Sequence, residues 1–147
     1  MKLNLLKFRM EQAFQIAEFS PCLKKKVGAV LLDSLTLDIR GKGFGGASIP
    51  CKECLRDKLI FQQDGCWSMH SELRTLFYYF NKYGFKEDLS NLIMLTTHGP
   101  CDSCIKYCVY FKIPTMIYFH PYKTDYIKWQ NQIKIYQLFE TGLKEQN

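Results

Sequence analysis

Apolar residues recur at regular spacings in the first third of the chain. A helix predicted over roughly residues 4–19 has one apolar face, made by Leu6, Met10, Phe14 and Ala17. Residues 26–32 form a near-continuous apolar run with two valines, which is typical of a strand buried on both faces. Residues 36–42 alternate apolar and charged side chains. We therefore predict a second strand at a sheet edge, paired antiparallel with the first.

The rest of the chain predicts alternating helices and strands. A long irregular segment, 43–67, precedes a helix that begins near His70. Strands at 92–97 and 115–119 flank a helix that begins near Pro100, which makes them parallel neighbours with a right-handed connection. A last helix is predicted from the apolar residues Tyr126, Trp129, Ile133 and Tyr136. This order predicts a three-layer α/β/α fold with a mixed sheet of four strands, or five if the C-terminus adds one.

Composition indicates one folded domain, residues 1–147, with 47% hydrophobic and 15% aromatic residues. No run approaches the ~18 apolar residues of a membrane span, and the N-terminus lacks a signal-peptide pattern. Seven cysteines without such a signal favour a reducing, cytoplasmic compartment and metal binding over disulfides. The net charge of +6 suits a nucleic acid or a small phosphorylated substrate equally well.

Two short motifs carry the chemistry. MHSE at 69–72 contains His-x-Glu, and GPCDSC at 99–104 contains Pro-Cys-x-x-Cys. This combination is the signature of zinc-dependent deaminases that act on bases. One imidazole and two thiolates can hold zinc and leave a fourth position for water, so we predict His70, Cys101 and Cys104 as ligands. Glu72, a carboxylate beside the metal and not bound to it, is predicted to carry protons between water, ring and departing ammonia.

Five segments together resemble the deoxycytidylate deaminase branch of the cytidine deaminase superfamily. They are SPCLKKKVGAVLL (20–32), GFGG (43–46), MHSE (69–72), TTHGPCDSC (96–104) and LFETGL (138–143). LFETGL resembles the end of the last helix and the glycine turn before a fifth strand, for which few residues remain. The resemblance implies a cytidine-deaminase-like fold, hydrolysis of dCMP to dUMP with release of ammonia, one catalytic zinc and a homo-oligomer.

The resemblance also implies how a substrate would bind. The backbone N–H groups of Ser71 and Glu72 would bind the pyrimidine carbonyl, and a main-chain carbonyl near His98 or Gly99 would accept from the departing amino group. Phe44 is a candidate to stack on the ring, with a core position as the alternative. The His98 side chain would line the site or make ordinary loop hydrogen bonds.

The remaining cysteines suggest a second metal site. Cys51-x-x-Cys54 has the spacing of a zinc chelate, and Cys66 lies just before His70. The resemblance adds Cys22 as a fourth ligand of a structural zinc. The alternative is four reduced thiols, some of them buried. Cys108 is expected in the core.

Two other functions stay open from the sequence. One is deamination of cytosine or adenine in tRNA or single-stranded DNA, where positive charge would hold phosphates. The other is a catalytically silent zinc-binding regulatory protein. Glu72 argues against a silent protein, because a scaffold needs the zinc ligands but no proton carrier. Gly45 keeps that possibility open, since it stands where the family has an asparagine that contacts the sugar.

Overall fold

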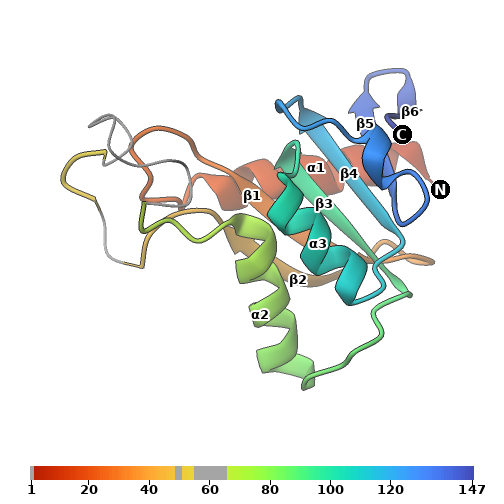
Figure 1. Cartoon of the computed structure of the whole chain (residues 1–147), viewed down its shortest axis with the longest axis horizontal. Helices are drawn as coiled ribbons and strands as arrows, with labels where there is room; N and C mark the ends of the chain where they lie inside the picture. The colour runs from red at the N-terminus through yellow and green to blue at the C-terminus, as the bar shows by residue number, and fades with distance from the viewer. Residues whose placement is uncertain (1, 49–50, 55–65) are drawn as a thin grey trace.

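A computed structural model of the chain describes residues 2–48, 51–54 and 66–147 (Figure 1). In chain order its elements are α1 (Leu3–Ala17), β1 (Gly28–Asp33), β2 (Ile39–Phe44), α2 (Ser71–Tyr83), β3 (Leu92–His98), α3 (Asp102–Tyr110), β4 (Thr115–His120), a 3₁₀ turn (Ile127–Trp129), β5 (Lys134–Phe139) and β6 (Gly142–Glu145). None of the helices in these described ranges has the length and apolar character needed to cross a membrane.

The described strands form one mixed six-stranded sheet in the order β2-β1-β3-β4-β5-β6. β1 pairs antiparallel with β2 and with β3, whereas β3, β4 and β5 run parallel to one another. The predicted hairpin, its edge strand β2 and the parallel pair β3–β4 are therefore confirmed. The sheet has more strands than the four or five expected, because the C-terminus contributes β5 and β6.

Helices cover both faces of the sheet, which gives the predicted three layers (Figure 1). Alternate residues of β1 enter two different cores, as the two-residue period of a strand requires. Ala29 and Leu31 pack with Leu76 of α2 and Ile105 of α3. The other face of β1 packs on α1, in a cluster that contains Leu6, Met10, Val30 and Leu32. The buried faces of β1 and β3 explain why these strands read as continuous apolar runs.

The predicted last helix is wrong. Its segment instead holds the 3₁₀ turn, then β5 parallel to β4, and β6 antiparallel to β5. Tyr126 and Ile133 are buried as expected, but Ile135 is fully buried too, and a helix would have turned it away. Isoleucine and tyrosine favour strands in such a short apolar run, where helical and strand spacings are hard to distinguish. The segment at 138–143 is accordingly a strand-to-strand turn, with φ of 140° at Gly142.

β2 lies unusually close to the start of α2, where the first motif stands. A Cβ added at Gly43 would meet Thr75 Oγ1 at 2.7 Å and the Thr75 backbone nitrogen at 2.8 Å. Only glycine allows this approach. Thr75 Oγ1 also lies 2.7 Å from the Ser71 carbonyl of its own helix and 3.4 Å from the Ala29 carbonyl of β1, so the start of α2 is held against the sheet.

Candidate active site

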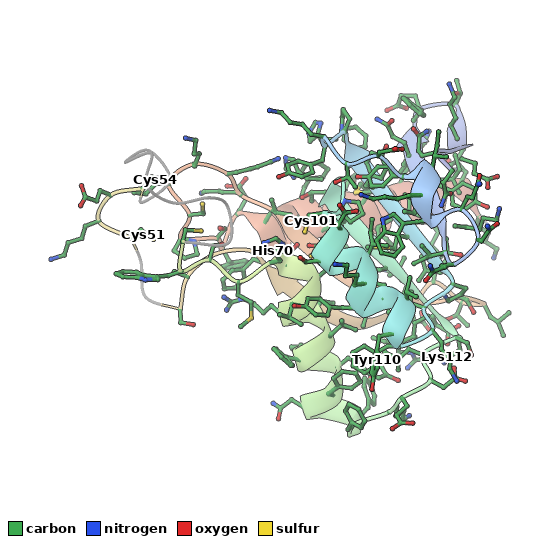
Figure 2. All side chains as sticks on the ribbon, in the orientation of Figure 1. Cys51, Cys54, His70, Cys101, Tyr110 and Lys112 are labelled. Atoms are coloured by element: carbon green, nitrogen blue, oxygen red, sulfur yellow. The ribbon has the colours of Figure 1, made fainter. Side chains whose placement is uncertain are left out.

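The two halves of the motif meet at the N-termini of two neighbouring helices. His70 is the N-cap of α2, Cys101 is the N-cap of α3, and Cys104 lies in the first turn of α3. Figure 2 shows His70 and Cys101 side by side at these helix starts. His70 Nδ1 lies 3.2 Å from Cys104 Sγ and 3.4 Å from Cys101 Sγ, and the two sulfurs are 3.6 Å apart. Among the described residues, this is the one group of at least three His, Cys, Asp or Glu side chains whose possible metal-ligating atoms all lie within 4.8 Å of one another.

These distances fit a tetrahedral zinc site. Zinc–sulfur bonds of about 2.3 Å and zinc–nitrogen bonds of about 2.0–2.1 Å put two sulfurs about 3.8 Å apart and a nitrogen and a sulfur about 3.6 Å apart. The observed separations of 3.6, 3.4 and 3.2 Å are shorter by a few tenths of an ångström. One imidazole and two thiols are a donor set that zinc prefers, with a fourth position left for water. The residues present therefore fit a catalytic zinc.

The two thiols also differ in their acidity in a way that favours a cation. The hydrogen bond with Cys104, helped by His70, lowers the pKa of Cys101 to about 4. The same contact and burial raise the pKa of Cys104 well above its ordinary value. One thiolate is stable here, and a second one so near would repel it. Both ionise together only when a positive charge lies between them, which is what zinc provides.

Glu72 stands beside this group without belonging to it. It lies in the first turn of α2, its side chain is only 5% exposed, and it lines the same pocket as His70 and Cys101. Ser71 Oγ donates to Glu72 Oε1 at 2.6 Å. The sequence did not predict this bond, because Ser71 was expected to act only through its backbone. The carboxylate is therefore held in one orientation at the pocket wall.

The pocket receives further polar groups from β3 and from the loops around it. His98, Gly99, Lys25 and Tyr122 all line it. His98 accepts from or donates to Thr97 Oγ1 through Nδ1 at 2.8 Å. Burial, followed by the nearby Lys25, lowers the pKa of His98 to about 4, so its ring is neutral at pH 7. Lys25 belongs to the lysine run at 24–26, which from the sequence is well explained as a solvated surface, and Tyr122 was not singled out from the sequence.

Cys22, Cys51, Cys54 and Cys66 also line this pocket, all partly exposed. Figure 2 shows Cys51 and Cys54 on the loop to the left of His70 and Cys101. Within the described residues, no three of these four cysteines bring their sulfurs within 4.8 Å of one another. Residues 55–65, which join Cys54 to Cys66, lie outside the described residues. The second zinc therefore stays a prediction. Cys108 is fully buried in the core, as expected.

Phe44 does not lie where the sequence hypothesis put it. It lines a separate surface hollow together with Arg74, Phe77 and Phe80, while its neighbour Gly45 lines the pocket. A ring at Phe44 is thus not placed to stack on a base bound in the pocket. The guanidinium group of Arg74 lies 4.7 Å from the centre of the Phe44 ring.

The C-terminal segment braces the second half of the motif from outside the pocket. Tyr126 donates its hydroxyl to the Pro100 carbonyl at 3.0 Å. Asp102 accepts from Trp129 Nε1 at 2.9 Å and from Lys128 Nζ at 2.8 Å. These bonds fix the turn that presents Cys101. No local pattern in the sequence predicts these bonds, because the partners are far apart in the chain.

The chain belongs to the family defined by the cytidine and deoxycytidylate deaminase zinc-binding region, whose model matches residues 4–120. That match contains both halves of the motif and every strand up to β4. No curated protein matches the sequence significantly.

Solved structures share the fold at low sequence identity. A dCMP deaminase from the cyanophage S-TIM5, in complex with dCMP and dUMP, superposes with a TM-score of 0.70 at 23% identity, over 93% of this chain and 98% of that one. A diaminohydroxyphosphoribosylaminopyrimidine deaminase/5-amino-6-(5-phosphoribosylamino)uracil reductase from Thermotoga maritima superposes with a TM-score of 0.65 at 18% identity. The match covers 92% of this chain and 36% of that one. A structure from a study of A-to-I editing by tRNA:A34 deaminases superposes with a TM-score of 0.54 at 18% identity. The match covers 79% of this chain and 77% of that one.

Proposed function

We propose that the chain is a zinc-dependent hydrolase that deaminates a pyrimidine nucleotide, converting dCMP and water to dUMP and ammonia. The observation that carries this proposal is the grouping of His70, Cys101 and Cys104 around one point, with buried Glu72 beside it in a pocket. The family supports deamination. The cyanophage enzyme supports the choice of substrate, because the match covers nearly the whole of that enzyme and its structure is a complex with dCMP and dUMP.

In this proposal His70, Cys101 and Cys104 hold the zinc, with both cysteines as thiolates. Zinc in such a site supplies Lewis acidity, which makes water reactive near neutral pH. The N-terminal ends of α2 and α3 point at the group and carry partial positive charge, which favours the thiolates of Cys101 and Cys104.

Glu72 acts as the proton carrier. Its carboxylate takes a proton from the attacking water and passes protons to the ring nitrogen and to the amino group that leaves as ammonia. The Ser71 hydroxyl donates to Glu72 Oε1 and so restrains the carboxylate, which leaves the other carboxylate oxygen for proton transfer. Burial of Glu72 excludes bulk water, which would otherwise compete for these protons.

Backbone groups orient the base. The first N–H groups of a helix have no partner within that helix, and Ser71 and Glu72 occupy these positions on the pocket lining. They are suited to donate to the pyrimidine carbonyl. A main-chain carbonyl in the turn at His98 and Gly99 is suited to accept a hydrogen bond from the departing amino group. Both residues line the pocket, just before the start of α3.

Lys25 supports a phosphorylated substrate over a nucleoside. It lines the pocket, and its ammonium lies 5.0 Å from the centre of the Tyr122 ring. Since the lowered pKa of His98 leaves its ring neutral at pH 7, Lys25 provides positive charge for a phosphate at the pocket. The same charge would serve a polynucleotide, so the assay must include one.

The proposal also covers domain organisation, location, oligomeric state and a second metal site. Residues 1–147 act as a single deaminase domain, a cytoplasmic enzyme of nucleotide metabolism that works as a homo-oligomer. Cys22, Cys51, Cys54 and Cys66 hold a second, structural zinc. None of these four cysteines is in a disulfide among the described residues, and their common position around the pocket supports this ligand set.

A substrate panel tests the proposal. Zinc-loaded protein is incubated with cytidine, deoxycytidine, CMP, dCMP, a cytosine-containing single-stranded oligonucleotide and a tRNA, and ammonia release is measured. Turnover of dCMP well above that of deoxycytidine supports the proposal. Turnover of only the oligonucleotide or the tRNA would favour a nucleic-acid deaminase instead, and no turnover at all would favour a silent homologue.

A further inference from the structure

A short segment that begins at the last residue of β2 separates the pocket from the surface hollow behind it. We call residues 44–47 the pocket wall. Gly45 and Ala47 line the pocket, whereas Phe44 turns into the hollow on the other side. Arg74, on the second turn of α2, lines only this hollow. It touches the pocket wall from behind and has no contact with the pocket itself.

Backbone bonds join the pocket wall to the residue just before His70. Gly46 N donates to the Met69 carbonyl at 3.0 Å, and Met69 N donates to the Gly46 carbonyl at 3.0 Å. Ser20 Oγ donates to the Gly45 carbonyl from the end of α1. A change in the position of the wall would therefore alter the pocket beside the zinc-ligand helix.

Arg74 adds a side-chain clamp to this arrangement. Its Nη2 donates to the Gly46 carbonyl at 2.8 Å, and its guanidinium lies 4.7 Å from the centre of the Phe44 ring. One side chain on α2 thus contacts the pocket wall at two residues, Phe44 and Gly46. A planar guanidinium can stack and donate at once, which is why arginine suits such a position.

The Arg74 side chain also has one feature that is unfavourable for folding. Arg74 Nε is buried and has no hydrogen-bond partner among the described residues. Burying an unpaired donor is unfavourable for folding. A residue that served only to pack α2 on β2 could be smaller and apolar, so the contact with the pocket wall is the evident benefit of arginine here.

We propose that Arg74 is a positioning residue, which fixes the pocket wall against α2 and thereby sets the affinity for substrate. This inference rests on the proposed function. Gly45 and Ala47, the parts of the wall that line the pocket, carry no titratable side chain, so the wall moves no protons. It binds ground state and transition state alike, and loosening it raises KM while kcat stays the same.

Two variants at Arg74 and one control elsewhere test this role. Arg74→Ala removes the clamp, and Arg74→Lys keeps a donor and a positive charge over Phe44. Arg9→Ala is the matched control. Arg9 also reaches from a helix to a backbone carbonyl, donating from α1 to Leu37 at 2.7 Å, in the turn at the other end of the same hairpin. It has no contact with the pocket wall.

We expect Arg74→Ala to raise KM for dCMP about tenfold, with kcat within about twofold of wild type and unchanged zinc content. Arg74→Lys should recover most of the affinity. Arg9→Ala should lower Tm but leave KM unchanged. A wild-type KM in Arg74→Ala, or an equal rise in Arg9→Ala, would overturn the inference.

Hydrogen exchange gives a readout that does not depend on activity. In Arg74→Ala the amides of Gly46 and Met69 should exchange about tenfold faster than in wild type, while Arg9→Ala leaves them protected. Unchanged protection in Arg74→Ala would contradict the inference even if wild-type protein proved inactive on dCMP. Inactive wild-type protein together with faster exchange in Arg74→Ala would instead count against dCMP as the substrate and leave the clamp supported.

Discussion

The Ser71 hydroxyl donates to the Glu72 carboxylate at 2.6 Å, and the two side chains are only 1% and 5% exposed. Both belong to the first turn of α2, directly after the ligand His70. A buried hydroxyl that has a carboxylate as its acceptor fixes the rotamer of that carboxylate. The proton carrier is thus aimed by its own neighbour in the sequence.

Ser71→Ala removes this bond and keeps the backbone N–H that faces the pocket. We expect kcat to fall about tenfold, because the Glu72 carboxylate then samples orientations that cannot reach the substrate. Zinc content and KM should stay close to wild type. Steady-state kinetics with elemental analysis checks this, and an unchanged kcat would remove the Ser71 hydroxyl from the account.

Glu72→Gln keeps the size of the side chain but cannot accept and return protons. Loss of a general acid–base costs about 10²–10⁴-fold in rate, and we expect at least this loss because one group serves several proton transfers. The protein should still fold and bind zinc. A variant with near-wild-type turnover would show that Glu72 has no part in the reaction.

Cysteine variants on α3 separate metal binding from packing. Cys101→Ala should lose the catalytic zinc along with activity, since a site with three protein ligands cannot spare one. Cys108→Ala, on the same helix but fully buried in the core, is the control and should keep zinc while lowering Tm. Zinc content of Cys101→Ala equal to that of the control would contradict the ligand assignment.

Metal content also tests the second site. If Cys22, Cys51, Cys54 and Cys66 hold a structural zinc, wild-type protein contains two zinc ions per chain and Cys54→Ala contains one. The variant should also lose activity about 10–100-fold, because Cys54 lines the pocket and its metal would support the loop there. Elemental analysis that returns a single zinc in carefully prepared wild-type protein would rule the site out.

The sequence predicted the first four strands and the zinc ligands for a clear physical reason. A strand buried on both faces must be apolar throughout, as 28–32 is, and zinc chemistry restricts residue types and spacing. The C-terminus was predicted wrongly because Tyr126, Ile133 and Tyr136 fit a helical spacing and also fit a turn followed by a strand.

The direction of loop side chains could not be read from sequence at all. Phe44 and Gly45 are neighbours at the end of β2, and which one faces the pocket depends on contacts that Arg74 and Met69 make from elsewhere. The hydrogen bond of Tyr126 to the Pro100 carbonyl likewise depends on how β4 returns the chain to the start of α3. Such contacts are set by the tertiary fold and leave no local pattern.

The most direct test of the proposed deaminase activity follows the conversion of dCMP by zinc-loaded wild-type protein, with product identity and ammonia measured together. We expect one dUMP and one ammonia for each dCMP consumed, with no conversion after zinc is removed by a chelator and recovery when zinc is restored. Zinc-loaded, folded protein that leaves dCMP unchanged would contradict it.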